Sequence, residues 1–146
     1  MLQLQNLKQT LALATVSTTA AATATSDAID TIGFSELQVC ILATTSNTVT
    51  NKFTVCKLQQ SDTTDGTFAD VTGYVGGTSF TVANANTSAG YLTILNVDLK
   101  GKKRYFKSVV SPATTQSITV LANLGRGAIA PSSATLQGVN TVVNPS

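Results

Sequence analysis

The chain has 146 residues, nine Lys and Arg against seven Asp and Glu, and a formal net charge of +2. It has no histidine, the usual acid–base group near neutral pH and the commonest metal ligand, and this argues against most catalytic triads, zinc sites and proton shuttles. One domain of this size can bury its own core, the charge is too small to indicate nucleic-acid or membrane binding, and no apolar run approaches the roughly 20 residues of a membrane span.

Residues 1–26 are dominated by Thr, Ala and Ser and are expected to form an extended N-terminal arm. Their apolar run, Leu11 to Val16, is short and interrupted by Thr15, and Lys8 is the only positive side chain nearby. We therefore do not expect a signal peptide here. The same run has strand character, which suits it to pairing with the edge of a sheet.

Residues 27–126 carry the strand signals and are expected to form one β-sandwich domain. The pattern is clearest at Ser117–Leu124, where apolar residues occupy every second position. The other predicted strands are Ala28–Ile32, Glu36–Thr44, Lys52–Gln60, Phe68–Val71, Phe80–Val82, Tyr91–Val97 and Phe106–Val110.

Turn formers separate these segments, for example Asp65-Gly66, Gly76-Gly77 and Ser111-Pro112. No segment keeps a 3.6-residue period. About eight strands at intervals near ten residues predict an all-β fold, either an antiparallel sandwich or a jelly roll. Residues 127–146 are again small and polar, and they are expected to form an extended C-terminal tail.

The two cysteines, Cys40 and Cys56, lie in neighbouring predicted strands. With a turn near Thr48 they would face each other in a hairpin. We favour two buried thiols that act as small hydrophobic side chains, with a cross-strand disulfide as the alternative. Two cysteines without further ligands do not make a metal site.

The acidic residues give no convincing catalytic or metal site. Asp62, Asp65 and Asp70 lack the ligand spacing of an EF-hand, and the Asp-Gly pair at position 65 is better explained as a tight turn. Asp27 and Asp30 need not converge in an extended chain. We therefore expect no catalytic residues, no cofactor and no metal, and the chain is not expected to be an enzyme.

One stretch concentrates positive charge, with Lys100, Lys102, Lys103, Arg104 and Lys107 close together. Two interpretations stay open. The side chains could be solvated at a turn, where they discourage association between sheet edges, or they could contact an acidic partner surface. The candidate contact residues are Lys102, Lys103 and Arg104. No aromatic platform accompanies them, so nucleic-acid binding is not expected.

The arms are the second candidate for contacts. Segments rich in Thr, Ala and Ser bury too little apolar surface to offset their loss of backbone entropy. They must fold back on their own domain or be held by neighbouring subunits. We expect the second, with Leu11, Leu13 and Val16 as contact residues of a dimer or trimer, and Thr141–Val143 has similar strand character. Deletion of residues 2–25 is then expected to leave the domain folded.

Several short motifs together resemble a group of small structural proteins of tailed bacteriophages. They are IDTIGF at Ile29–Phe34, KLQQSD at Lys57–Asp62, DGTFADV at Asp65–Val71, GKKRYFKSVVSP at Gly101–Pro112, and LGRGA at Leu124–Ala128. The resemblance covers about residues 27–130, which is most of the predicted core.

The resemblance implies a capsid decoration, or cement, protein with a β-sandwich or jelly-roll fold. Such a protein binds the outside of the major capsid shell as a dimer or trimer and clamps adjacent capsomers. It would be made in the host bacterial cytoplasm and located on the virion surface. The alternatives are a tail, head-fibre or baseplate component, or a receptor- or glycan-binding module on the virion.

Overall fold

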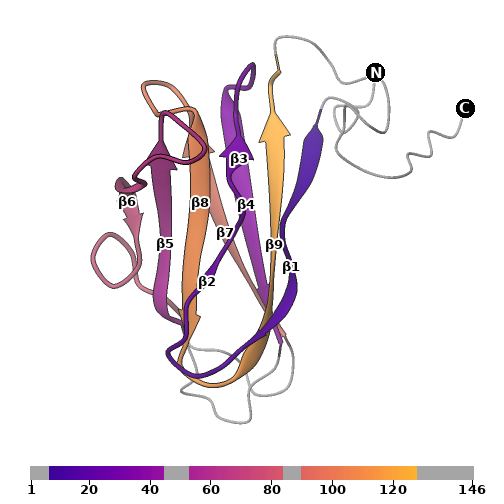
Figure 1. Cartoon of the computed structure of the whole chain (residues 1–146), viewed down its shortest axis with the longest axis vertical. Coiled ribbons are helices and arrows are strands. Elements are labelled where there is room, and N and C mark those ends of the chain that lie inside the picture. The colour runs from indigo at the N-terminus through magenta and orange to yellow at the C-terminus, as the bar shows by residue number, and fades with distance from the viewer. Residues whose placement is uncertain (1–6, 45–52, 84–89, 128–146) are drawn as a thin grey trace, which may run out of the picture.

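Two antiparallel sheets pack face to face in the computed structural model, which describes residues 7–44, 53–83 and 90–127 (Figure 1). Sheet A has four strands in the order β1-β9-β4-β7. Sheet B has five, in the order β2-β8-β5-β6 with β3 also paired to β8. The described residues contain no helix long and apolar enough to span a membrane.

The strands are β1 (Lys8–Thr18), β2 (Ala24–Thr25), β3 (Ile29–Asp30), β4 (Glu36–Ala43), β5 (Phe53–Ser61), β6 (Ala69–Val75), β7 (Tyr91–Asp98), β8 (Tyr105–Pro112) and β9 (Gln116–Gly125).

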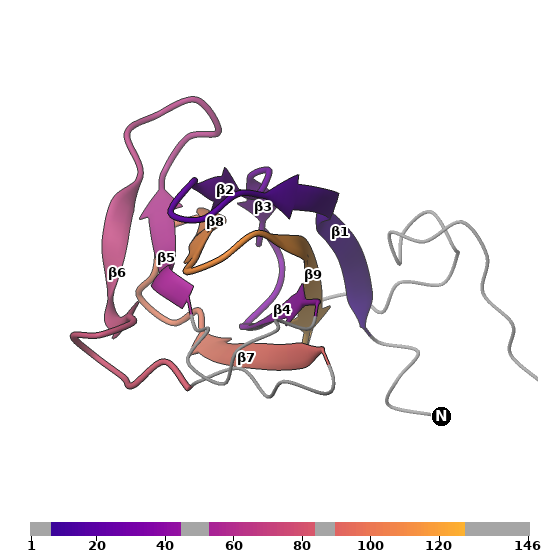
Figure 2. The same cartoon turned by 90° about the horizontal axis from the view of Figure 1, so that it is seen from below.

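The chain passes repeatedly from one sheet to the other, as the view along the strands shows (Figure 2). When β2 and β3 are counted as one interrupted strand, eight strands follow the order β1-β9-β4-β7 over β2/β3-β8-β5-β6. This is the arrangement of a double Greek-key jelly roll. The predicted all-β antiparallel fold is therefore confirmed.

The core lies between the sheets and is filled by alternate residues of the central strands. Val39, Ile41 and Val120 point inward from sheet A, and Leu58 and Phe106 from sheet B, all with no exposed side-chain surface. Burial of such side chains stabilises the fold by about 1.5–3 kcal/mol each before entropy is counted. These inward-facing side chains account for the apolar residue at every second position of β9 and β4.

The predicted strands at Glu36–Thr44, Tyr91–Val97 and Ser117–Leu124 agree with β4, β7 and β9 to within one residue at each end. The predicted strand at Phe80–Val82 is wrong. The Gly77 N–H donates to the Phe80 carbonyl oxygen at 2.8 Å, which folds the chain back locally, and Phe80 forms only an isolated bridge with Gly76.

The N-terminal arm differs from the prediction in the residues that the structure describes. β1 is the edge strand of sheet A, paired with β9, and β2 pairs with β8. Ala12 and Ala24 are buried in the core. Because β9 has backbone donors and acceptors to satisfy on the side away from β4, β1 folds back on its own domain. The domain therefore begins before residue 27, and deletion of residues 2–25 would remove part of its core.

The predicted hairpin between the two cysteines is also wrong. β4 pairs with β7 and β9 in sheet A, whereas β5 pairs with β6 and β8 in sheet B, so Cys40 and Cys56 lie in different layers. Both thiols are free. Cys56 is buried in the core, and this burial raises its pKa to about 11. Cys40 is half-buried on the outer side of sheet A, so the buried-thiol prediction describes only Cys56. The turn near Thr48 and the segment Thr141–Val143 lie outside the described residues.

Candidate functional site

Several acidic residues are engaged in structural contacts. Asp70 accepts hydrogen bonds from Lys57 at 3.0 Å and Gln59 at 2.8 Å, and Asp62 forms an ion pair with Lys103 at 2.8 Å. Within the described ranges, no group of three or more Cys, Asp or Glu side chains could hold a metal ion. The two surfaces described next are the candidate contact sites.

The predicted basic patch is partly neutralised by its own chain. The guanidinium of Arg104 donates to both carboxylate oxygens of Asp30, at 2.8 and 2.7 Å. These hydrogen bonds hold the pKa of Asp30 below its usual value. Lys103 is paired with Asp62. Both pairs are solvent-exposed, so each contributes little to stability and can open for a partner. Lys102 forms no ion pair within the described part of the chain.

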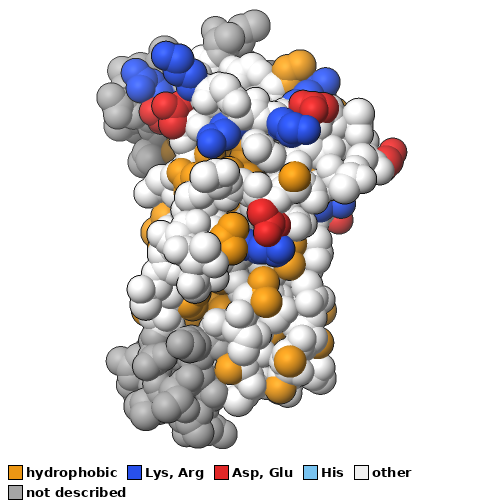
Figure 3. Space-filling view, turned by 90° about the vertical axis from the view of Figure 1, so that its left-hand side faces the viewer, with side chains coloured by type: hydrophobic (Ala, Val, Ile, Leu, Met, Phe, Trp, Pro, Cys, Tyr) orange, Lys and Arg blue, Asp and Glu red, His pale blue; other side chains and the backbone are white. Residues whose placement is uncertain are grey.

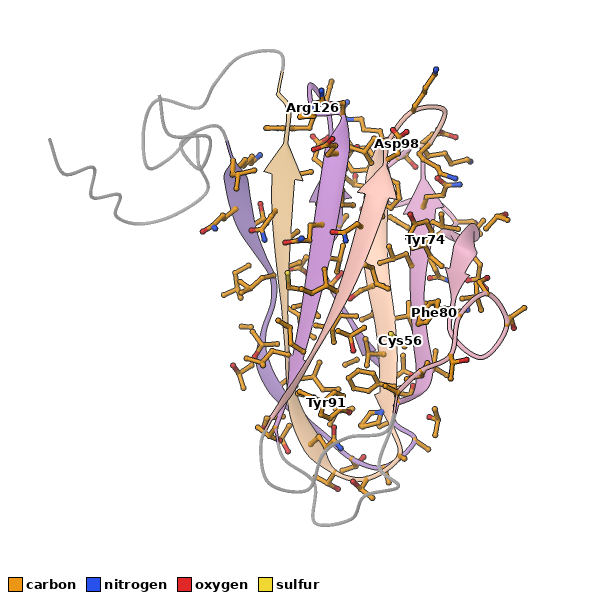
Figure 4. All side chains as sticks on the ribbon, turned by 180° about the vertical axis from the view of Figure 1, so that it is seen from behind. Cys56, Tyr74, Phe80, Tyr91, Asp98 and Arg126 are labelled. Atoms are coloured by element: carbon orange, nitrogen blue, oxygen red, sulfur yellow. The ribbon has the colours of Figure 1, made fainter. Side chains whose placement is uncertain are left out.

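These charges belong to one end of the molecule, which we call the charged end. It is made up of Asp30, Glu36, Asp62, Asp65, Asp98, Lys100, Lys102, Lys103, Arg104 and Arg126. Arg126 and Asp98 lie together at this end, whereas Tyr91 lies at the other (Figure 4). The described residues at the opposite end, in 18–23, 75–83 and 112–116, include no charged side chain. Figure 3 shows Lys, Arg, Asp and Glu gathered toward the charged end.

A second surface covers the outer side of sheet A. The register places Leu11 of β1 opposite Leu121 of β9, Leu121 opposite Cys40 of β4, and Cys40 opposite Ile94 of β7. These four side chains form one row across all four strands. Leu11, Leu121 and Ile94 are 54%, 43% and 46% exposed. This is an unusual use of large apolar side chains, which normally point into the core.

A second apolar row lies next to the first, farther from the charged end. Leu42 of β4 is opposite Leu92 of β7 and Thr119 of β9. Leu42 and Leu92 are about half exposed. The Thr119 hydroxyl forms a hydrogen bond of 2.7 Å with that of Thr15 on β1. We call the two rows together the apolar sheet face, defined by Leu11, Cys40, Leu42, Leu92, Ile94 and Leu121.

A row of amides separates the apolar sheet face from the charged end. Gln38 donates to Asn96 at 2.9 Å, and Asn123 donates to Gln38 at 3.1 Å. Glu36 and Arg126 follow as an ion pair of 3.1 Å at the end of the sheet. The outer side of sheet A thus changes from ionic to amide to apolar along its strands.

The outer side of sheet B has a different character. It carries the Lys57–Asp70 ion pair, Gln59, and Lys107, whose ammonium lies 4.4 Å from the centroid of the Phe68 ring. Charged and amide side chains of this kind are well solvated. The two outer sides of the same sandwich are therefore chemically distinct, and only that of sheet A presents rows of large apolar side chains in the described residues.

The outer side of sheet A is not flat. A shallow concavity of about 410 Å³ opens beside Leu42 and is lined also by Thr15, Gly90 and Thr119. A second, of about 510 Å³, lies nearer the charged end beside Gln38 and is lined also by Glu36, Asn96, Asp98, Asn123 and Arg126. Hollows of this size and openness can receive side chains of a partner protein.

The three predicted contact residues of β1 are separated by its two register irregularities, one between Leu11 and Leu13 and one between Leu13 and Val16. Leu11 points outward on the apolar sheet face. Leu13 is opposite buried Val120 and packs against the core. Val16 is 39% exposed but is opposite the inward-facing Ile118, so it lies beside the apolar sheet face and not on it.

Sequence reasoning missed Leu42, Leu92, Ile94 and Leu121. A signal was present, because β4 reads ELQVCILA and β7 reads YLTILNVD, with apolar residues at both odd and even positions. Strands with one face in water alternate cleanly, and strands covered on both faces do not. The broken alternation in β4 and β7 was therefore the signal for apolar residues on the outer side of sheet A.

No family model and no curated protein sequence matches this chain. Among solved structures, it is similar to the PBSX exported protein XepA, with a TM-score of 0.53 and 14% identity over 94% of this chain and 42% of XepA. It is also similar to a structure of infectious bursal disease virus, Gt strain, with a TM-score of 0.52 and 13% identity over 84% of this chain and 32% of that one. The chain spans less than half the length of either protein, and these likenesses establish the fold alone.

Proposed function

We propose that this chain is a virion structural protein, specifically a capsid decoration protein that binds the outer surface of the major capsid shell and stabilises adjacent capsomers. The observation that carries the proposal is a jelly roll whose outer surface is built for contact, with an apolar sheet face and a charged end. Support comes from the phage-like motifs, and from similar folds in a PBSX exported protein and in a virus.

The physical requirements of such a role fit this surface. A capsid presents many identical sites, so a protein that bridges two of them gains affinity through effective concentration even when each contact is modest. Clamping neighbouring capsomers opposes internal pressure without any chemical step. A surface of ion pairs, amides and aliphatic side chains suffices for this.

We place the contact to the shell at the charged end, through Lys102, Lys103 and Arg104. Lys102 has no ion-pair partner among the described residues, and the exposed pairs of Lys103 and Arg104 can exchange their partner for an acidic group on the shell. Charges in such a position mainly raise the association rate and fix orientation, and salt weakens their effect.

Binding to purified particles tests this placement. The double variant Lys102→Gln/Lys103→Gln should associate about tenfold more slowly at low salt, and the difference should shrink at high salt. The matched control is Lys57→Gln/Lys107→Gln, which removes the same charge and also one ion pair, but on the outer side of sheet B.

The control should bind like the wild type, and labelled protein should be seen on heads by electron microscopy. Equal slowing of both variants would show that net charge alone matters and would reject the charged end as the contact. Label confined to tails would favour the fibre or baseplate alternative.

A further inference from the structure

We propose that the apolar sheet face is a homodimer interface, occupied by the same face of a second copy of this chain. The observation behind it is the pair of apolar rows that cross all of sheet A, with five large side chains each 43–55% exposed. This proposal goes beyond the virion role and would hold whatever particle the protein binds.

The charge distribution favours a second copy as the occupant. Neither apolar row carries a charged side chain, so two copies of this face meet without like-charge repulsion. A twofold axis brings the same patch of both subunits together, so the patch must be complementary to itself. Leu, Ile and Thr side chains meet this requirement, and amides such as Gln38 and Asn96 add both donors and acceptors. A charged partner would find nothing to pair with on these rows.

The dimensions of sheet A also suit a dimer. Strands about 4.8 Å apart and residues rising about 3.3 Å give a face of roughly 500 Å² for four strands of eight residues. Two copies would then bury roughly 1,000 Å², which is near the lower limit for a specific interface. We therefore expect a dissociation constant in the micromolar range.

The change from charged to apolar side chains along the strands of sheet A favours one arrangement of the two copies. When the two sheets stack with their strands antiparallel and the axis passes between the Cys40 and Leu42 rows, each row covers the other row of the partner. Glu36, Asp98 and Arg126 then remain at the rim in water. A parallel arrangement would instead place the two charged ends side by side. In the antiparallel dimer the two charged ends would point away from each other, and each would be free to contact a capsomer.

Sedimentation of the full chain between about 1 and 200 µM tests the proposal at concentrations that span the expected affinity. The wild type should pass from monomer to dimer. The variant Leu121→Lys/Ile94→Lys should weaken dimerisation by at least about a hundredfold, because two charges per subunit would be buried without partners. The control is Ile32→Lys, which adds one such charge at a position that is 62% exposed but lies outside sheet A.

Cross-linking gives the geometry. Packed sheets lie about 10 Å apart, so a short flexible bismaleimide should join Cys40 to Cys40 of the partner in dilute solution. The control Cys40→Ser/Ile32→Cys moves the reactive thiol off the face and should remain uncross-linked. Cys56 is buried and should not react in either protein.

Three results would overturn the proposal. They are a wild type that stays monomeric to 200 µM, a Lys double variant that still dimerises, and a larger cyclic oligomer that ignores both Lys substitutions. Particle binding is measured separately. A dimer that does not bind heads would refute the virion role alone, whereas a monomer that binds heads through Leu121 and Ile94 would refute the dimer alone.

Discussion

Two titratable groups, the buried Cys56 and the half-buried Tyr91, lie near one another between the sheets. Burial raises the pKa of Cys56 to about 11, and mainly burial raises that of Tyr91 to about 12. The Tyr91 hydroxyl donates to the Gln116 side-chain oxygen at 2.9 Å, and its ring lies 5.1 Å from that of Phe53. Both side chains are neutral below pH 9, so the native state can bury them without placing a charge in the core.

The pH dependence of stability follows from these shifts. A raised native pKa means that the native state holds its proton more tightly, so the free energy of unfolding falls as pH rises from 9 toward 11 through Cys56. A shift of this size corresponds to a loss of roughly 3 kcal/mol. Denaturant titrations between pH 7 and pH 11 should show a smaller decline in Cys56→Ala than in the wild type, whereas Cys40→Ala, which keeps the buried Cys56 thiol, should stay closer to the wild type. An equal decline in both variants would contradict the assignment.

At the scale of elements, β1 is the strand whose role differs most from the one expected of the N-terminal segment. It completes sheet A against β9, and its bulge turns Ala12 into the core while Leu11 and Ala14 stay exposed. The same strand therefore serves both the core and the apolar sheet face.

A matched pair of variants in β1 tests its place in the core. Ala12→Asp should reduce the free energy of unfolding by at least about 3 kcal/mol, because it buries a charge without a partner. Ala14→Asp adds the same charge to an exposed position of the same strand and should change stability by about 0.5 kcal/mol or less. Equal effects of the two substitutions would mean that β1 is a detachable arm after all.

The sequence was sufficient to predict most of the strands but not their pairing. β4, β7 and β9 follow local patterns of side-chain size and turn formers, and these patterns can be read directly from the sequence. Their arrangement depends on contacts between distant positions, such as the hydrogen bond between Thr15 and Thr119, 104 residues apart. Local patterns cannot specify such contacts, so the supposed Cys40–Cys56 hairpin and the detached arm were both wrong.

The site was predicted only in part for the same reason. Leu11 was singled out because it lay in an unexplained apolar run, and Lys102, Lys103 and Arg104 because they were clustered. Leu42, Leu92 and Ile94 looked like core residues until the register placed them on the outer side of sheet A. In a strand with apolar residues at both odd and even positions, the partner strands decide which of these residues point into the core.

At the scale of the whole molecule, the sandwich carries surfaces of different chemical character on its different sides. Charges gather at one end, rows of apolar side chains cross the outer side of sheet A, and the outer side of sheet B carries an ion pair exposed to water. A dimer through the apolar sheet face would present two charged ends to two neighbouring capsomers. This geometry combines self-association with bridging, which is what a clamp on a repeating shell requires.

The most direct test of the virion role is the release of DNA from heated particles. Particles stripped of the protein should lose their DNA at a lower temperature than intact ones, and wild-type protein added back should restore the original temperature, while adsorption to cells stays unchanged throughout. Heads that hold their DNA equally well without the protein, together with a loss of adsorption, would contradict the account and identify a receptor-binding module.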